Sequence, residues 1–152
     1  MRSLLLFGHY LGFVLWLGAG LAAMPAGGML KNAGREESAL LVGLMARIYR
    51  GMLLPGAVLT VLTGLLLTLR LYGGPISAAG YPVPLMVMQG AGLVGAVLAI
   101  GVTFPATARL ARLDPHGPHA AVFAALRRRS AVSGMISGLL GLAALVAGAW
   151  LR

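Results

Sequence analysis

The stretch Leu4–Ala23, LLLFGHYLGFVLWLGAGLAA, decides the fold, because its apolar side chains run almost without interruption. A helix of about 20 residues crosses the roughly 30 Å hydrocarbon layer of a bilayer. Three further stretches of this kind follow, at Met52–Leu71, Leu85–Thr103 and Ala131–Leu151. The sequence therefore predicts an all-α integral membrane four-helix bundle, formed as a single domain by residues 1–152.

Composition argues against a soluble domain of this length. Hydrophobic residues make up 59% of the chain and charged residues only 10%, and a small soluble chain could not bury so much apolar surface. The first stretch is too long for the core of a cleaved signal peptide and contains His9, Tyr10 and Trp16, so we expect it to remain as a span. The chain has no cysteine, which excludes disulfides and thiolate metal sites.

The basic residues are distributed unevenly between the two sides of the predicted spans. Only Arg2, Arg70 and Arg152 fall on the side of the termini. By the positive-inside rule we expect both basic connections in the cytoplasm, both termini outside, and the protein in the inner (cytoplasmic) membrane. The net charge of +9 then faces anionic headgroups, so the expected partner is the lipid bilayer and no nucleic acid. The basic residues of the two connections are Lys31, Arg35, Arg47, Arg50, Arg109, Arg112 and Arg127–Arg129.

Two spans are predicted to continue beyond the membrane as helices. Glu36-Glu37-Ser38 is typical of a helix start, and the apolar pattern runs from there through Arg50 into the second span. Residues His119–Arg129 are expected to extend the fourth span in the same way. The outer connection, Tyr72–Pro84, is rich in glycine and proline and predicts a compact loop, whereas Asp114–Pro118 predicts a tight break.

A weak internal repeat emerges when the second half is laid over the first at an offset of about 80 residues. Met24-Pro25 then falls on Phe104-Pro105, and the Arg47/Arg50 entry to span two falls near Arg127–Arg129. This alignment predicts two pseudo-repeated helical hairpins, related by an axis along the membrane normal, in which spans one and three are equivalent.

His9 is the candidate functional residue within the membrane. It lies about five residues inside the outer end of span one, and span three enters from the same side, so Met86, Met88 and Gln89 are expected at the same depth. The helical face of His9 continues through glycines and Trp16, which suits either close helix contact or a flat cofactor. The arrangement predicts a haem pocket between spans one and three.

The chemistry of these residues fits haem in outline. Imidazole is a common axial ligand of haem iron, and the sulfur of Met86 or Met88 could bind the opposite side. Arg70, at the outer end of span two, is expected where propionates would emerge. The alternative is that His9 is a packing residue bonded to a backbone carbonyl or to Gln89, with the methionines as ordinary core.

The remaining polar residues favour packing over transport. No span carries Asp or Glu, which argues against a proton pump built on an intramembrane carboxylate. His116 and His119 are expected to be a solvated pair rather than a metal site. The glycines of Gly8-x-x-x-Gly12 and Gly134-x-x-x-Gly138 allow helices to approach closely, within one chain or in a homo-oligomer. The hydroxyls expected to bond to helix carbonyls are Thr60, Thr63, Thr68, Ser133 and Ser137.

Two segments resemble known families. They are His9-Tyr-Leu-Gly-Phe-Val-Leu-Trp16-Leu-Gly18 and Arg47-Ile-Tyr-Arg50-Gly-Met52-Leu-Leu-Pro55, the latter followed by Thr60 and Gly64. They resemble the helical membrane protoporphyrinogen oxidases and the related copper-resistance-protein-D-like families, which have an early His before Trp-x-Gly and a basic entry to a second span with a Met/Pro pair. The likeness is best over residues 9–70 and falls to the helix pattern alone in the second half.

The resemblance implies b-type haem at His9 and, in an oxidase, a porphyrin substrate and an electron-carrier partner. The chain departs from the oxidases in its Met52-to-Pro55 spacing and in lacking a basic residue in Leu85–Thr103, so haem binding is the firmer implication. Three hypotheses follow: a haem-dependent oxidoreductase, a metal- or small-solute transporter with a path through Gln89, Thr63 and Thr68, and a non-catalytic assembly subunit.

Overall fold

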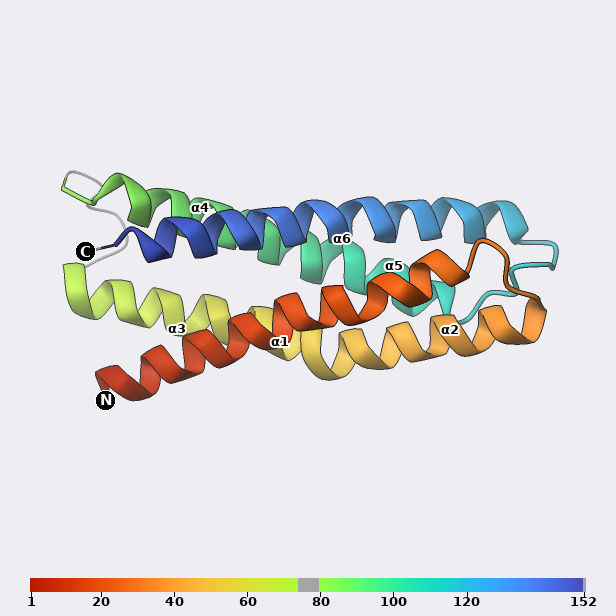
Figure 1. Ribbon diagram of the computed structural model, residues 1–152, viewed down its shortest axis with the longest axis horizontal. Helices are drawn as coiled ribbons and strands as arrows, with labels where there is room; N and C mark the ends of the chain where they lie inside the picture. The colour runs from red at the N-terminus through yellow and green to blue at the C-terminus, as the bar shows by residue number, and fades with distance from the viewer. Residues whose placement is uncertain (74–79, 152) are drawn as a thin grey trace.

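The chain folds into four long helical rods (Figure 1). The computed structural model describes residues 1–73 and 80–151, and every regular element within these ranges is helical. Two π-helical turns join successive α-helices without a break, so eight elements make only four rods. The all-α prediction is confirmed. The elements are α1 (Arg2–Met29), α2 (Arg35–Ile48), η1 (Tyr49–Leu53), α3 (Leu54–Tyr72), α4 (Val83–Leu98), η2 (Ala99–Thr103), α5 (Phe104–Leu110) and α6 (Ala120–Ala149).

All four rods are long and apolar enough to cross a membrane. The predicted extension before span two is confirmed, because the second rod begins at Arg35 with Glu36 and Glu37 in its first turn, where carboxylates favour the positive helix end. The extension before span four is confirmed as well, since α6 begins at Ala120. The third helix runs past Pro105 to Leu110, further than predicted. Part of the predicted outer loop, residues 74–79, lies outside the described residues.

Glycines bring α1 against α3. A Cβ atom built on Gly12 would lie 2.7 Å from the backbone nitrogen of Thr60, and one on Gly56 would lie 2.6 Å from the backbone nitrogen of Trp16. Neither position has room for a side chain, so the helices approach through their backbones, as small residues allow in membrane helices. The Gly8-x-x-x-Gly12 motif therefore serves contact within the chain. Gly138 of the second motif has no neighbour that its Cβ would touch.

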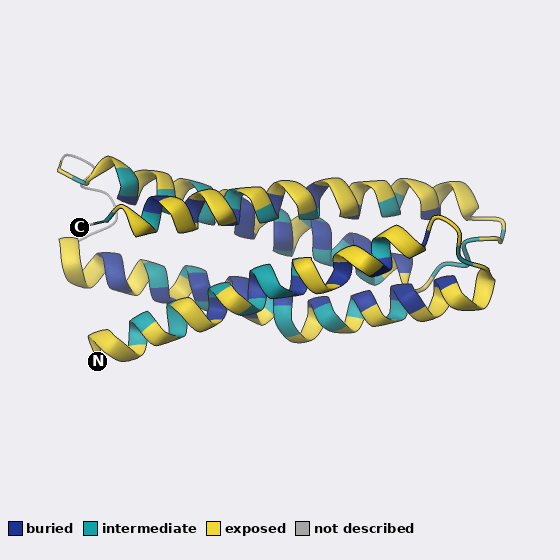
Figure 2. Ribbon diagram, viewed as in Figure 1, coloured by how far each residue is buried: buried dark blue, intermediate teal, exposed yellow. Residues whose placement is uncertain are grey.

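Serine and threonine hydroxyls join α6 to the rod formed by α4, η2 and α5. The Oγ atoms of Ser133 and Thr103 are 2.9 Å apart, and Ser137 donates to the carbonyl of Gly95 over 2.9 Å. These side chains are buried, and Figure 2 shows the buried positions gathered on the inner faces of the rods. Burying a hydroxyl is favourable only where it is hydrogen-bonded, so these pairs fix the register of α6 on its neighbour.

Both π turns lie just before a proline. The amide of Leu54 bonds to the carbonyl of Tyr49, and the amide of Phe104 bonds to that of Ala99, each spanning five residues rather than four. Pro25 lies inside α1 without such a turn. In local geometry Pro105 therefore corresponds to Pro55, whereas the predicted repeat paired it with Pro25.

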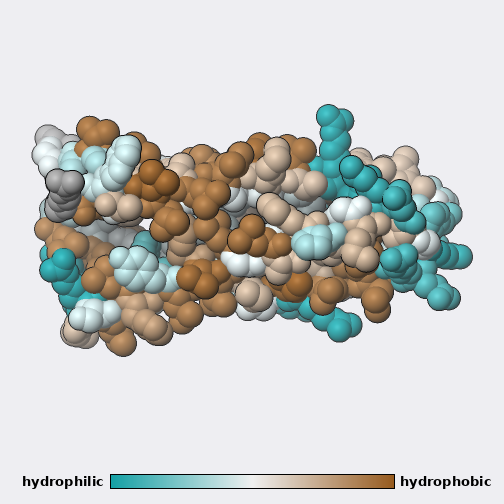
Figure 3. Space-filling view, viewed as in Figure 1, coloured by the Kyte–Doolittle hydropathy of each residue, from teal (hydrophilic) through white to brown (hydrophobic). Residues whose placement is uncertain are grey.

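The long sides of the bundle are apolar and one end is hydrophilic (Figure 3). Large apolar side chains exposed along the rods include Phe7, Val14, Leu62, Leu93 and Leu139. We call the end opposite the two chain termini the basic end; it holds the connections from α1 to α2 and from α5 to α6 (Figure 1).

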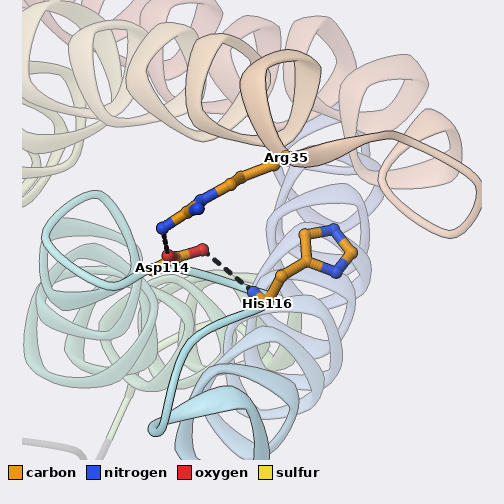
Figure 4. A network of polar contacts seen from close by, with 3 residues as sticks. All are labelled: Arg35, Asp114 and His116. Atoms are coloured by element: carbon orange, nitrogen blue, oxygen red, sulfur yellow. Dashed lines mark hydrogen bonds and ion pairs between the residues drawn. The ribbon is translucent and has the colours of Figure 1, made fainter.

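An ion pair between Arg35 and Asp114 links α2 to the α5–α6 connection at the basic end (Figure 4). Asp114 Oδ1 also accepts the backbone N–H of His116 over 3.0 Å. This N–H first, and then the Arg35 guanidinium, hold the pKa of Asp114 below its usual value. The connection is the predicted break between helices, and the carboxylate fixes its turn.

Candidate functional site

His9 lies at the contact between α1 and α3, half-buried. Its Nδ1 atom is 2.9 Å from the carbonyl oxygen of Thr60 and 3.3 Å from the hydroxyl of Thr63. A Cβ atom on Gly64 would lie 3.0 Å from the imidazole Cε1, so a side chain there would crowd the ring. We call His9, Thr60, Thr63 and Gly64 the histidine cluster.

The hydrogen bonds of the cluster determine which nitrogen of His9 carries the proton. A carbonyl oxygen can only accept, so Nδ1 must donate its N–H to Thr60. The Thr63 hydroxyl donates to the carbonyl of Leu59 on its own helix, which leaves its oxygen free to accept from the same N–H. The neutral ring therefore keeps its lone pair on Nε2. Histidines that bind metals are commonly held in this way, by an N–H bond to a backbone carbonyl.

Gln89 lies near this cluster but on another contact. Its amide nitrogen donates to the hydroxyl of Thr68 over 2.8 Å, which joins α4 to α3. Thr68 is one helical turn beyond Gly64, so Gln89 lies about 6 Å further toward the chain termini than the ring of His9. Gln89 and His9 therefore contact the same rod at different levels. The prediction that they lie at one depth is off by about a turn.

The two predicted methionine ligands lie outside the helix contact that holds His9. A Cβ atom added to Gly148 of α6 would lie 3.2 Å from the sulfur of Met88, so Met88 packs between α4 and α6. The side chain of Met86 is exposed on the outer surface. The structure does not bring these methionines together with His9, because α3, not α4, is the neighbour of α1 at this level.

Trp16 lies at the centre of the bundle. Its side chain is only 2% exposed, and its indole N–H donates to the Oγ of Ser137 on α6 over 3.3 Å. The ring also lies against Gly95 of α4, where an added Cβ would come within 3.1 Å. Trp16 thus fills the space between the two helix pairs, and its indole is already in full contact with protein.

Arg70 lies at the outer end of the same contact between α1 and α3. It lines a pocket of about 240 Å³ with Met1, Leu4, Leu5 and Leu66. Leu5 is one helical turn from His9, on the side of the termini, and no residue of the histidine cluster lines the pocket. Arg70 therefore lies on the same helix contact as His9 but nearer the chain termini.

The bond from His9 to a backbone carbonyl is the one that the packing alternative predicted, but sequence reasoning did not identify its partners on α3. Thr60, Thr63 and Gly64 are spaced i, i+3, i+4 and so share a helix face, which is the signal that could have identified them. Each threonine hydroxyl also bonds to its own helix: Thr60 to Gly56, and Thr68 to Gly64. The expectation that these hydroxyls satisfy helix carbonyls is confirmed.

Among the described residues, no group of three His, Cys, Asp or Glu side chains is placed to hold a metal ion. His116 and His119 are both exposed. Comparison with models of protein families, with curated proteins and with solved structures found no match to this chain. Arguments about function therefore rest on the residues and their geometry.

Proposed function

We propose that the protein is an integral membrane protein that binds b-type haem through His9. The membrane part is supported by four apolar rods and by large apolar side chains exposed along their length. In water such a continuous apolar surface would aggregate, whereas in lipid it is the favourable outer surface. With the basic end in the cytoplasm, as the positive-inside rule indicates, both termini lie outside.

The observation that carries haem binding is the hydrogen bond from His9 Nδ1 to the carbonyl of Thr60. It orients the ring, fixes the tautomer and leaves Nε2 as the atom able to bind iron. The packing alternative predicts the same bond, since a carbonyl fixes this tautomer in a structural histidine as well, and the two readings differ in whether Nε2 binds iron. Haem, when bound, would supply one-electron redox chemistry.

The neighbouring residues fit the group in part. Arg70, at the outer end of the contact between α1 and α3, can pair with propionate carboxylates. Met86 and Met88 lie outside the helix contact that holds His9, so the proposal keeps His9 as the only axial ligand from the predicted set. The copper-resistance-like alternative and a solute path through Gln89 are less favoured, since the amide and the threonine hydroxyls along it are engaged in helix packing.

The test is an absorption spectrum of the full-length protein, expressed with ample haem, extracted in mild detergent, and recorded oxidised and dithionite-reduced. His9→Ala is compared with His119→Ala, which removes an exposed imidazole outside the contact between α1 and α3. We expect a Soret band and a reduced α-band in the wild type and in His119→Ala, and their loss in His9→Ala. Gly64→Ala, which crowds the ring, should weaken binding while keeping the imidazole.

Circular dichroism of each variant separates loss of haem from loss of fold. A folded wild type without a visible band would refute haem binding and leave transport or assembly as the role of the chain. Bands that persist in folded His9→Ala would place the haem elsewhere. Redox or oxidase activity is the next question only if the bands depend on His9.

A further inference from the structure

A second pocket lies at the basic end, on the far side of the bundle from Arg70. It has a volume of about 150 Å³ and lies between the rod of α2 and η1 and the rod of η2 and α5. One wall carries Ala46, Arg47 and Arg50, and the other carries Phe104, Ala108 and Arg112. Three arginine side chains from two rods therefore line one small space.

The charge of this pocket is not neutralised by acidic side chains. The chain has only three acidic residues, and Asp114 forms the only ion pair among the described residues, with Arg35. The C-terminal end of α5 adds a partial charge of roughly −0.5, which is small beside three formal positive charges. The pocket is thus suited to an anion, and planar guanidinium groups bind phosphate oxygens in pairs.

The level of the pocket points to the source of the anion. Measured along the helix axis, Arg50 and Phe104 each lie roughly 30 Å from the end of their own rod nearest the chain termini. This distance is about the thickness of the hydrocarbon layer. The pocket therefore lies where headgroups begin. Its lining combines three arginines with three alanines and Phe104, which matches a group that has both a phosphate and acyl chains.

We propose that this pocket binds the phosphate group of an anionic phospholipid on the cytoplasmic side. Basic pockets between membrane helices on this side are suited to such headgroups. The lipid would join the second and third rods, which contribute the two walls, and would hold the two π turns together. The proposal rests on the membrane-spanning part of the proposed function and not on haem binding.

The test is native mass spectrometry of the full-length protein in detergent, titrated with phosphatidylglycerol or with phosphatidylcholine. The variant Arg47→Gln/Arg50→Gln is compared with Arg128→Gln/Arg129→Gln, which removes the same charge from exposed positions outside the pocket. We expect the wild type to retain phosphatidylglycerol at least about tenfold better than phosphatidylcholine, and the pocket variant to lose this preference. The control variant should change retention less than about threefold.

Two further arms make each outcome decisive. Arg50→Lys keeps the charge but not the paired hydrogen bonds, so an intermediate loss of phosphatidylglycerol retention supports phosphate recognition. This variant also replaces the double variant in the test if the double variant does not fold. Inorganic phosphate that displaces the lipid supports the same chemistry, whereas inorganic phosphate that binds where phosphatidylglycerol does not would overturn the lipid as its source. Equal losses in the pocket and control variants would reduce the site to general surface charge. Alkaline washing of membranes before extraction tests membrane insertion separately.

Discussion

Replacing Gly12 by alanine is expected to separate α1 from α3. The new Cβ would lie 2.7 Å from both the backbone nitrogen and the Oγ1 of Thr60, and 2.9 Å from the carbonyl oxygen of Gly56. Ordinary contacts of a Cβ begin at 3.4 Å, so the helices must move apart by about 0.7 Å. Two of the three contacts are with backbone, and no side-chain rotation can relieve them.

The energetic cost follows from this displacement. Overpacking of a well-packed contact costs about 1–3 kcal/mol. A rigid shift would also lengthen the bond from His9 to Thr60 from 2.9 Å to about 3.6 Å, beyond hydrogen-bond length, which costs about 1 kcal/mol more. Alanine returns about 1 kcal/mol through its better helix propensity. The net expectation is a loss of about 1–3 kcal/mol for Gly12→Ala.

Gly20→Ala is the matched control, because Gly20 lies two turns further along α1 and an added Cβ there touches nothing within 4 Å. It should be neutral or more stable by up to about 1 kcal/mol. Unfolding of both detergent-extracted variants by sodium dodecyl sulfate, followed by circular dichroism, measures the difference. If Gly12→Ala unfolds at the same detergent fraction as Gly20→Ala, the close contact between α1 and α3 is not what stabilises this pair.

Two further predictions concern the other contacts of the bundle. A double-mutant cycle with Thr103→Val and Ser133→Ala should give a coupling of about 1 kcal/mol in the same unfolding assay, because their hydroxyls are 2.9 Å apart and buried; additive effects would contradict the bond. For Asp114, the lowered pKa means that its stabilising effect is full above the unfolded pKa of about 3.9 and is lost as the pH falls through the folded value. The difference in melting temperature between wild type and Asp114→Asn should therefore be largest above about pH 5 and shrink as the pH falls below the unfolded pKa, and a difference that does not change with pH would rule out the carboxylate as its cause.

The helices could be predicted because their physical causes are local. Apolar runs of membrane length and the Glu36-Glu37 start are properties of short segments, and the structure reproduces the four rods and the extensions of the second and fourth. The face of α1 that carries His9 and Trp16 could also be read from the helical period. These features need no knowledge of which helices are neighbours.

The partners of that face could not be read in the same way. Span three enters the membrane from the same side as span one, and this led to the prediction that Met86 and Met88 lie at the depth of His9. In the structure the neighbour of α1 is α3, which belongs to the second span and not to the third. This is expected for antiparallel helices joined by a short connection. The choice of neighbour depends on where glycines permit backbone contact. Gly12 and Gly56 determine that contact, and they lie in separate spans that no local pattern relates.

The π turns had a sequence signal of their own. Proline lacks an N–H and its ring clashes with the carbonyl four residues earlier, so a helix that continues through it must kink or widen. Gly51 stands four residues before Pro55 and Gly101 four before Pro105, whereas Leu21 holds that place before Pro25. Both glycines are exposed and leave space for the widened turn. Each π turn adds a residue to its rod at the level of the pocket lined by Arg47, Arg50 and Arg112. The residues beyond the turn therefore point in directions that a regular helix would not give. The spacing Gly-x-x-x-Pro thus relates the second and third rods, the two that form the walls of the pocket.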